Sequence, residues 1–329
     1  MSDADRLDHA LAAGLPWPEG PVLCLRPRPE PGWSEHRDRL RCLQSFRPDH
    51  DTLGRLGLTR FEALEPAEAA LVCLTRARAE NLGNIARAWD VLPDGASLIV
   101  TGAKTDGIDS VLKQVRKVMP VAEVVAKAHG KLFWTLKDPA SPPPPDWAAD
   151  AALRQNADGF HTAPGMFSPD RVDPGSELLA ARFGPEIAGR VADLGAGWGW
   201  LSAQLLEAAP EVTEVALYEA EGLALDAAQR NVTDARARFH WADVTALPGD
   251  SFDWVITNPP FHSGRAAEPG LGQAFIAAAA RVLAPSGNAL IVANRQLPYE
   301  AALNAAFRDW EELPGSGVYK LFRARRPKS

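Results

Sequence analysis

The chain has 329 residues, of which 46% are hydrophobic and 23% charged, and this predicts a soluble protein of about two globular domains. The net charge of −7 argues against binding of nucleic acid through an overall positive field, so any RNA contact must come from local basic patches. Residues 1–138 carry 19 basic and 19 acidic side chains, so the excess negative charge lies in the rest of the chain. A polar beginning and the lack of a long apolar run predict a cytoplasmic protein without a membrane span.

The first half alternates strand patterns with helix patterns, which is typical of an α/β sheet. In chain order we expect a short polar helix, strands at 22–25 and 70–74, a helix over 76–90, a strand at 97–100, a helix over 107–118, and strands at 121–126 and 131–136. This half has no glycine-rich loop and no catalytic cluster, and Cys24, Cys42 and Cys73 lack the spacing of metal ligands. We therefore predict a fold without a catalytic or metal site.

A proline-rich segment separates the two halves, with four prolines in a row at 142–145. Such a segment is typical of a stiff, extended linker. We predict a first domain over 1–138, a linker over 139–152 and a second domain over 153–329.

The second half contains a glycine turn after an apolar strand. The strand ends in Asp193-Leu194-Gly195-Ala196-Gly197, and a helix follows to about residue 209. Glycines let a ligand approach the backbone, and the beginning of a helix offers free N–H groups. By itself this turn is weak evidence, and it departs from the dinucleotide fingerprint in the place of the third glycine.

The next two strands each lead to a carboxylate. Glu219 ends a strand 24 residues after Gly195, a place where an acidic side chain accepts two ribose hydroxyl groups. Asp243 follows the strand at 238–241, and its carboxylate suits the amino group of an adenine. An ordinary exposed strand end is the alternative for both residues.

The strand at 252–257 ends in Asn258-Pro259-Pro260-Phe261, around which the second half is organised. The Asn258 amide offers an acceptor oxygen, and the two prolines stiffen the backbone. Phe261 adds a flat aromatic face. Carbonyl oxygens beside an aromatic ring suit a planar amine, whereas a plain turn with a core Phe is the alternative.

The remaining elements complete a mostly parallel sheet. We expect helices at 222–231, 271–283 and 299–307, a strand at 289–293, and a terminal hairpin of strands at 310–313 and 318–323. This is the layout of class I methyltransferases that use S-adenosylmethionine. Residues 91–100 also echo residues 282–292, so we predict two tandem Rossmann-like domains, the N-terminal one degenerate.

Four motifs carry a resemblance to a known family. They are Pro164-Gly165-Met166-Phe167-Ser168, Asp193–Gly197, Asn258–His262, and Ile291–Asn294 with Leu297-Pro298-Tyr299. With these motifs the chain resembles the bacterial ribosomal RNA guanine-N2 methyltransferases of the small-subunit methyltransferase C type. The bulky Trp198-Gly199-Trp200 after the turn is a departure that puts local helix packing in doubt.

The resemblance implies methyl transfer from S-adenosylmethionine to the N2 amine of a guanosine in ribosomal RNA. Asn258 and Pro259 would accept hydrogen bonds from the amine, Pro260 would hold the turn, and Phe261 would stack on the flipped base. For the cofactor, Asp193, Gly195 and Gly197 would hold the methionine end, Glu219 the ribose and Asp243 the adenine. Phe167 would cover the substrate, and the N-terminal domain would bind RNA or stabilise the protein.

Several alternatives remain open at this point. The large-subunit guanine-N2 enzymes have the same motifs, and adenine-N6 methylation is compatible with the tetrapeptide alone. A protein glutamine-N5 methyltransferase uses a similar clamp, although such proteins usually have Tyr in place of Phe261 and a helical N-terminal domain. A non-catalytic RNA-binding assembly factor is the alternative outside enzymes.

Overall fold

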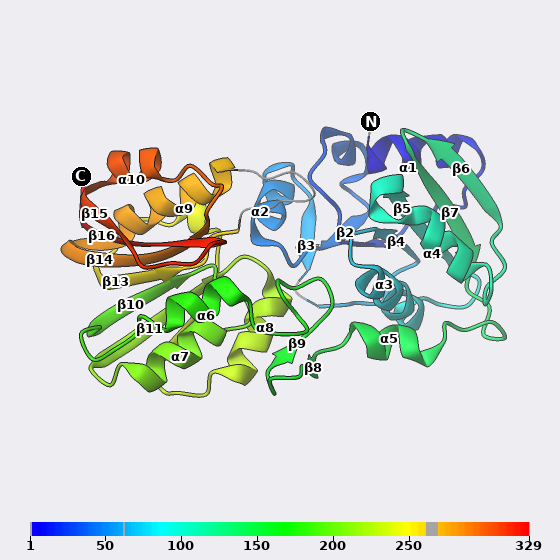
Figure 1. Ribbon diagram of the computed structural model, residues 1–329. Helices are drawn as coiled ribbons and strands as arrows, with labels where there is room; N and C mark the ends of the chain where they lie inside the picture. Colours follow the sequence, from blue (N-terminus) through cyan, green and yellow to red (C-terminus); the bar gives the residue numbers. More distant parts are fainter. Residues whose placement is uncertain (1, 62, 261–268, 329) are drawn as a thin grey trace. The chain divides into compact units, whose positions relative to one another are not determined.

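The structure is a computed structural model that describes residues 2–61, 63–260 and 269–328 (Figure 1). Contacts divide the chain into two compact units. Unit 1 contains Met1–Ala152 and Ala163–Gly165, and unit 2 contains Leu153–Thr162 and Met166–Ser329. Each unit is built on its own sheet of seven strands.

The sheet of unit 2 has the strand order β12-β11-β10-β13-β14-β16-β15. Its strands are β10 (Gly189–Leu194), β11 (Val212–Glu219), β12 (Ala237–Trp241), β13 (Phe252–Thr257), β14 (Leu283–Asn294), β15 (Phe307–Leu313) and β16 (Tyr319–Pro327). Its helices are α6 (Pro174–Ala180), α7 (Trp200–Ala208), α8 (Gly222–Asn231), η3 (Val244–Ala246), α9 (Pro269–Val282) and α10 (Glu300–Ala306), and β8 (Arg154–Gln155) pairs with β9 (His161–Thr162). Only β16 runs antiparallel to its neighbours in the seven-stranded sheet, so the expected terminal hairpin is confirmed.

Side chains alternate between the two faces of this sheet, as the period of a strand requires. On β14, Ala289 and Ile291 belong to one apolar cluster, whereas Leu290 and Val292 belong to the other. The first cluster includes residues of α9 and α10, and the second includes residues of α6, α7 and α8. Figure 1 shows these two groups of helices on opposite sides of the strands. The sheet is therefore buried on both faces, which explains its continuous apolar strands.

Unit 1 repeats this topology with the order β3-β2-β1-β4-β5-β7-β6. Its strands are β1 (Val22–Leu25), β2 (Leu40–Leu43), β3 (Thr59–Phe61), β4 (Ala69–Cys73), β5 (Ser97–Ala103), β6 (Glu123–Lys127) and β7 (Gly130–Leu136). Its helices are α1 (Asp3–Ala12), η1 (Pro31–His36), α2 (Arg47–Arg55), α3 (Arg78–Val91), η2 (Lys104–Asp106), α4 (Ile108–Val115) and α5 (Pro145–Ala151). Strands β4 and β13 hold the same place in the two sheets, so the predicted duplication of the fold is confirmed.

The segment 139–152 differs from the extended linker that we expected. Its second part forms α5, with Pro at the first turn, where a missing N–H costs nothing. Trp147 is buried in the core of unit 1, and a Cβ on Gly83 of α3 would come within 2.2 Å of the Ala151 Cβ. The burial of Trp147 fixes this helix on unit 1, which the run of prolines did not reveal.

Candidate functional site

The glycine turn and Asn258 lie at the ends of neighbouring strands. β10 pairs in parallel with β13, and Asp193 is the register partner of Ile256. The Thr257 hydroxyl donates to the Leu194 carbonyl oxygen at 2.7 Å, which ties the two strand ends together. Because α7 follows β10 on one face and α9 follows β13 on the other, the order of the strands reverses between these ends, and this is where open α/β sheets bind ligands.

The glycine turn has a backbone that only glycine adopts without strain. Gly195, Gly197 and Gly199 have φ angles of +76°, +56° and +86°. A Cβ on Gly197 would meet no atom within 4 Å, so space is open beside it. The Gly197 N–H donates to Glu219 Oε2 at 2.8 Å, and this bond joins the turn to the end of β11.

Asp193 is fully buried beneath this turn. Its Oδ2 accepts a hydrogen bond from the Ser202 hydroxyl at 2.7 Å, whereas Oδ1 has no partner among the described residues. Burial raises the pKa of Asp193 to about 7; the Ser202 hydrogen bond lowers this pKa and the charge of Glu219 raises it. The site therefore holds a buried oxygen that still lacks a donor.

The two strand-end carboxylates lie where the sequence placed them, at the ends of β11 and β12. Glu219 accepts the N–H groups of Gly197 and Glu221, each at 2.8 Å. Burial raises its pKa above the usual range, and these backbone bonds oppose that rise. Asp243 caps η3 by accepting the Thr245 N–H at 2.8 Å and the Thr245 hydroxyl at 2.7 Å, both at Oδ1.

Asn258 directly follows β13 as a half-buried side chain, and buried Pro259 and exposed Pro260 come next. The amide Nδ2 donates to Asp173 Oδ2 and Ser176 Oγ, both at 2.9 Å. Asp173 is the N-cap of α6 and Ser176 lies in its first turn, and the sequence did not reveal their contact with Asn258. Phe261 and His262 lie outside the described residues.

Phe167 is an exposed aromatic residue, with 53% of its surface accessible. Its carbonyl oxygen accepts a hydrogen bond from the Trp198 indole N–H at 2.9 Å, so its loop is tied to the glycine turn. The next residue, Ser168, has a φ angle of +44°, which is unusual for a residue with a side chain. The bulky Trp198 therefore has a structural role: it joins the loop of Phe167 to the turn.

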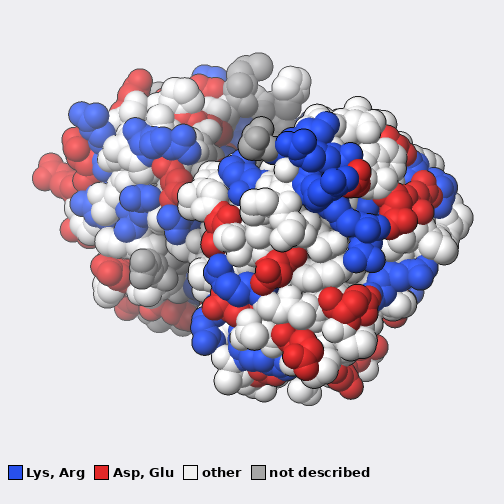
Figure 2. All heavy atoms as spheres, turned by 90° about the vertical axis from the view of Figure 1, so that its left-hand side faces the viewer, with Lys and Arg blue, Asp and Glu red and all other residues white. Residues whose placement is uncertain are grey.

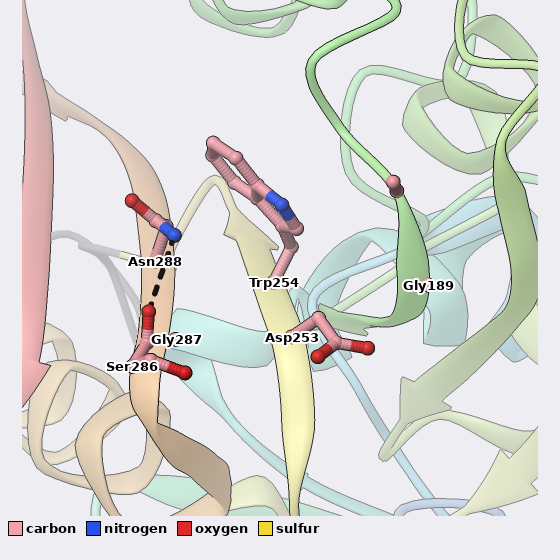
Figure 3. A pocket seen from close by; sticks show the side chains of 7 residues that line it. Gly189, Asp253, Trp254, Ser286, Gly287 and Asn288 are labelled. Carbon is pink, nitrogen blue, oxygen red and sulfur yellow. Dashed lines mark hydrogen bonds between the residues drawn. The ribbon is translucent and has the colours of Figure 1, made fainter.

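A cavity of about 360 Å³ lies near the beginnings of β10 and β13, away from the strand ends that carry the glycine turn and Asn258. Figure 3 shows its lining. Gly189, Asp253 and Trp254 come from the beginnings of β10 and β13, and Ser286, Gly287 and Asn288 come from the first part of β14. None of the predicted site residues lines this cavity. Parallel sheets bind ligands at their carboxyl ends, so we place the candidate site at those ends.

In Figure 2, Lys and Arg side chains are interspersed with Asp and Glu side chains. At the end of the chain, Arg325 pairs with Glu311 and Arg326 pairs with Asp309. Contact with RNA through local basic patches therefore stays a prediction.

Within 2–61, 63–260 and 269–328, no three His, Cys, Asp or Glu side chains lie together in a group that fits a metal ion. In the same ranges, none of the helices combines the length and the apolar character needed to cross a bilayer.

A family model described as the methyltransferase small domain matches residues 158–323, about half of the chain. The chain belongs to this family. The ribosomal RNA small subunit methyltransferases C of Yersinia pestis (strain Pestoides F) and Yersinia pseudotuberculosis (serotype O:3, strain YPIII) are each 29% identical to it over 276 residues, which covers 80% of this chain and 78% of theirs.

A solved structure extends the comparison to both units of this family member. The 16S rRNA N2 methyltransferase of T. Thermophilus, in complex with AdoMet and guanosine, superposes with a TM-score of 0.77 and 26% identity. The superposition covers 98% of this chain and 91% of the other. The shared fold includes the degenerate sheet of unit 1 as well as the sheet that carries the glycine turn.

Proposed function

We propose that the chain transfers a methyl group from S-adenosylmethionine to the N2 amine of a guanosine in small-subunit ribosomal RNA. The observation that carries this proposal is the position of Asn258 beside the glycine turn. Its side-chain nitrogen Nδ2 donates the two hydrogen bonds to Asp173 and Ser176. The amide oxygen of Asn258 then serves as an acceptor at the candidate site. Its partner is ribosomal RNA or the small ribosomal subunit, and the reaction takes place in the cytoplasm.

The residues around the glycine turn fit S-adenosylmethionine. The buried Asp193 Oδ1 has no donor among the described residues, which suits the ammonium group at the methionine end. The open space at Gly197 admits a ligand close to the backbone. Glu219 holds ribose hydroxyl groups, and Asp243 accepts from the adenine amino group. When bound, S-adenosylmethionine supplies a methyl group already activated by its sulfonium charge.

The chain's own task is then to align and orient the amine. The lone pair of the guanine N2 is delocalised into the ring, so the free amine is a poor nucleophile. Hydrogen bonds from its two protons to Asn258 Oδ1 and the Pro259 carbonyl oxygen direct the lone pair toward the methyl group. The flipped base stacks on Phe261, and exposed Phe167 covers it, which offsets part of the cost of unstacking.

Two properties of similar proteins support guanosine of the small subunit over the alternatives. The T. Thermophilus structure holds guanosine together with AdoMet, and the Yersinia relatives carry small-subunit names. The α/β fold of unit 1 also differs from the helical domain that glutamine-N5 methyltransferases usually carry.

A transfer assay with radiolabelled S-adenosylmethionine tests this function. The purified chain is incubated with unmodified small-subunit RNA, unmodified large-subunit RNA or the assembled small subunit, and the nucleosides are separated and identified by mass. We expect N2-methylguanosine from the small-subunit substrates alone. Label in N6-methyladenosine, in large-subunit RNA or in protein glutamine would overturn the assignment.

A further inference from the structure

The Asn258 side chain is held through its nitrogen alone. An amide nitrogen carries two hydrogens, and the acceptors Asp173 Oδ2 and Ser176 Oγ use both of them. The acceptors are the N-cap of α6 and a residue of its first turn, 85 and 82 residues away in the chain. The carbonyl oxygen Oδ1 is thereby the group of this amide that is turned away from α6.

The two acceptors are themselves buried and fixed. Asp173 is 9% exposed and Ser176 is 8% exposed. Asp173 is the N-cap of α6, and its Oδ2 also accepts the Ser176 N–H at 2.9 Å. A Cβ on Gly175 would come within 2.8 Å of Tyr319 Cε1, so a glycine lets the helix begin this close to β16. The first turn of α6 is therefore a rigid support for the amide of Asn258.

We propose that Asp173 and Ser176 are positioning residues that fix the rotation of the Asn258 amide and present its Oδ1 to the guanine amine. This inference rests on the proposed function and deepens it. A carboxylate only accepts hydrogen bonds, so a half-turn of the amide would set Oδ1 against Asp173 Oδ2. The same half-turn would face the N–H groups of the amine with N–H groups. Asp173 thus selects the rotation that methyl transfer needs.

The charge of Asp173 also acts through the amide. Hydrogen bonds to ionised acceptors are stronger than neutral ones, and bonds in series polarise each other. Electron density shifted toward Oδ1 makes this oxygen a better acceptor for the amine. Asp173 is itself buried and contacts the Asn258 amide, so in this proposal its effect on the rate is transmitted through Asn258.

The first test is the variant Asp173→Asn. It keeps the size of the side chain and an oxygen for the helix cap, but its amide offers N–H groups as well, so Asn258 is free to take either rotation. We expect kcat to fall about ten- to a hundred-fold, the factor of one lost hydrogen bond to a charged group. The Kd of S-adenosylmethionine, measured by calorimetry, stays unchanged. Unchanged kcat, or a parallel loss of cofactor affinity, overturns the proposal.

The second test reverses the hydrogen bond between the two positions. Asn258→Asp places two carboxylates against each other, so we expect a larger loss of kcat than in D173N. In the double variant D173N/N258D, the amide at 173 donates to the carboxylate at 258, whose second oxygen still accepts from the amine. We expect the double variant to recover at least about ten-fold over N258D. A double variant no more active than N258D contradicts the positioning role.

The wild-type protein is assayed in parallel on small-subunit RNA and separates the two proposals. If it produces no N2-methylguanosine, the proposed function fails before the positioning role is reached. If it does so and D173N matches its kcat, the positioning role alone fails. Ser176→Ala removes one of the two acceptors and keeps the charge, so its kcat falls by a smaller factor than that of D173N.

Discussion

The residues at the carboxyl ends of the strands differ between the two sheets, although the strands have the same order. After β10, unit 2 has a glycine turn with open space at Gly197. After β1, unit 1 has Arg26-Pro27-Arg28-Pro29, and Arg26 takes a φ angle of +58°. Long side chains and prolines therefore stand in unit 1 where unit 2 exposes its backbone.

The arginines of unit 1 bridge the ends of its central strands. Arg28 donates to both carboxylate oxygens of Asp106 at 3.1 Å, and to the Leu74 carbonyl oxygen at 3.3 Å. Arg26 pairs with Glu80 at 3.0 Å. These bonds connect the end of β1 with the segments that follow β4 and β5. The chain's own arginines thus bridge the strand ends that correspond to the proposed cofactor site of unit 2.

Two further pairs of strand ends show the same difference, with a candidate site residue in unit 2 and a residue bound within its own unit in unit 1. Glu219 ends β11 as a carboxylate, whereas Gln44 follows β2 and donates to the Pro27 carbonyl oxygen at 2.9 Å. Asn258 follows β13, whereas Leu74 and Thr75 follow β4, and the Thr75 N–H is bound to the Asn81 side chain at 2.8 Å. The apolar pattern of the strands determines the fold, and a few residues just beyond the strands determine whether it has a site.

The sharpest contrast between the units is Asn258, which unit 1 lacks. Asn258→Ala removes the acceptor for the amine, so we expect methyl transfer to fall by about a thousand-fold or more, because this contact is made in the transition state. The affinity for S-adenosylmethionine stays nearly unchanged. Label transfer to RNA gives the rate and calorimetry gives the Kd. Equal losses of rate and affinity would show that Asn258 supports the cofactor rather than the amine.

A second contrast lies inside the strands, where the penultimate residue is Asp193 in β10 and Cys24 in β1. Burial raises the pKa of Asp193 from 3.8 to about 7. The folded protein therefore keeps a proton that the unfolded chain has lost, and the free energy of unfolding falls as the pH rises from about 4 to about 7. Asp193→Asn stays neutral and does not show this decrease. The total decrease in the free energy of unfolding is at most about 4 kcal/mol.

Urea unfolding of the ligand-free protein at several pH values measures the effect. Unit 1 is common to the wild type and to D193N, so the difference between them reports on Asp193. A wild-type protein that gains stability relative to D193N between pH 4 and pH 7 would falsify the buried, protonated state.

The elements of unit 2, and the places of its candidate site residues at the strand ends, were predictable because their signals are local. The turn at Gly195 and Gly197 and the tetrapeptide at Asn258 are contiguous, and each follows an apolar strand, so sequence neighbours are also neighbours in the site. The contacts of Asn258 with Asp173 and Ser176 were not predictable. These residues are more than eighty positions apart in the chain, and only the folded sheet brings them together.

The elements that were missed in unit 1 have weak apolar patterns. In β2, α2 and β3, which span 40–61, the strands are short and the helix is polar, with Leu53 as its buried residue. Their stability comes from pairing with β1 and from packing on the core around Trp33, which a local pattern does not show. Helix α5 was missed because the run of prolines indicated an extended linker, whereas the burial of Trp147 holds this segment on unit 1 as a helix.

A smaller effect is expected at two corresponding positions, Glu219 at the end of β11 in unit 2 and Gln44 after β2 in unit 1. Glu219→Ala removes the proposed acceptor of ribose hydroxyl groups and releases the Gly197 N–H, so we expect S-adenosylmethionine to bind about ten- to a hundred-fold more weakly. Gln44→Ala in unit 1 is the control and leaves the Kd unchanged. Calorimetry should also give one site per chain. An unchanged Kd for E219A removes this residue from the cofactor site.

The smallest expected effect tests what the arginines of unit 1 do. Arg28→Ala leaves the Asp106 carboxylate without its cation, and that side chain is only 3% exposed. Arg28 is itself half exposed, so we expect a loss of about 1–2 kcal/mol in the stability of unit 1. The affinity for S-adenosylmethionine and the rate of methyl transfer stay the same, because the proposed cofactor site lies in unit 2. Thermal unfolding measures the loss, and Arg28→Lys should recover part of it. If R28A instead lowers methyl transfer to RNA while the melting temperature holds, Arg28 contacts the substrate, and unit 1 then has a recognition role that the bonds of its arginines do not reveal.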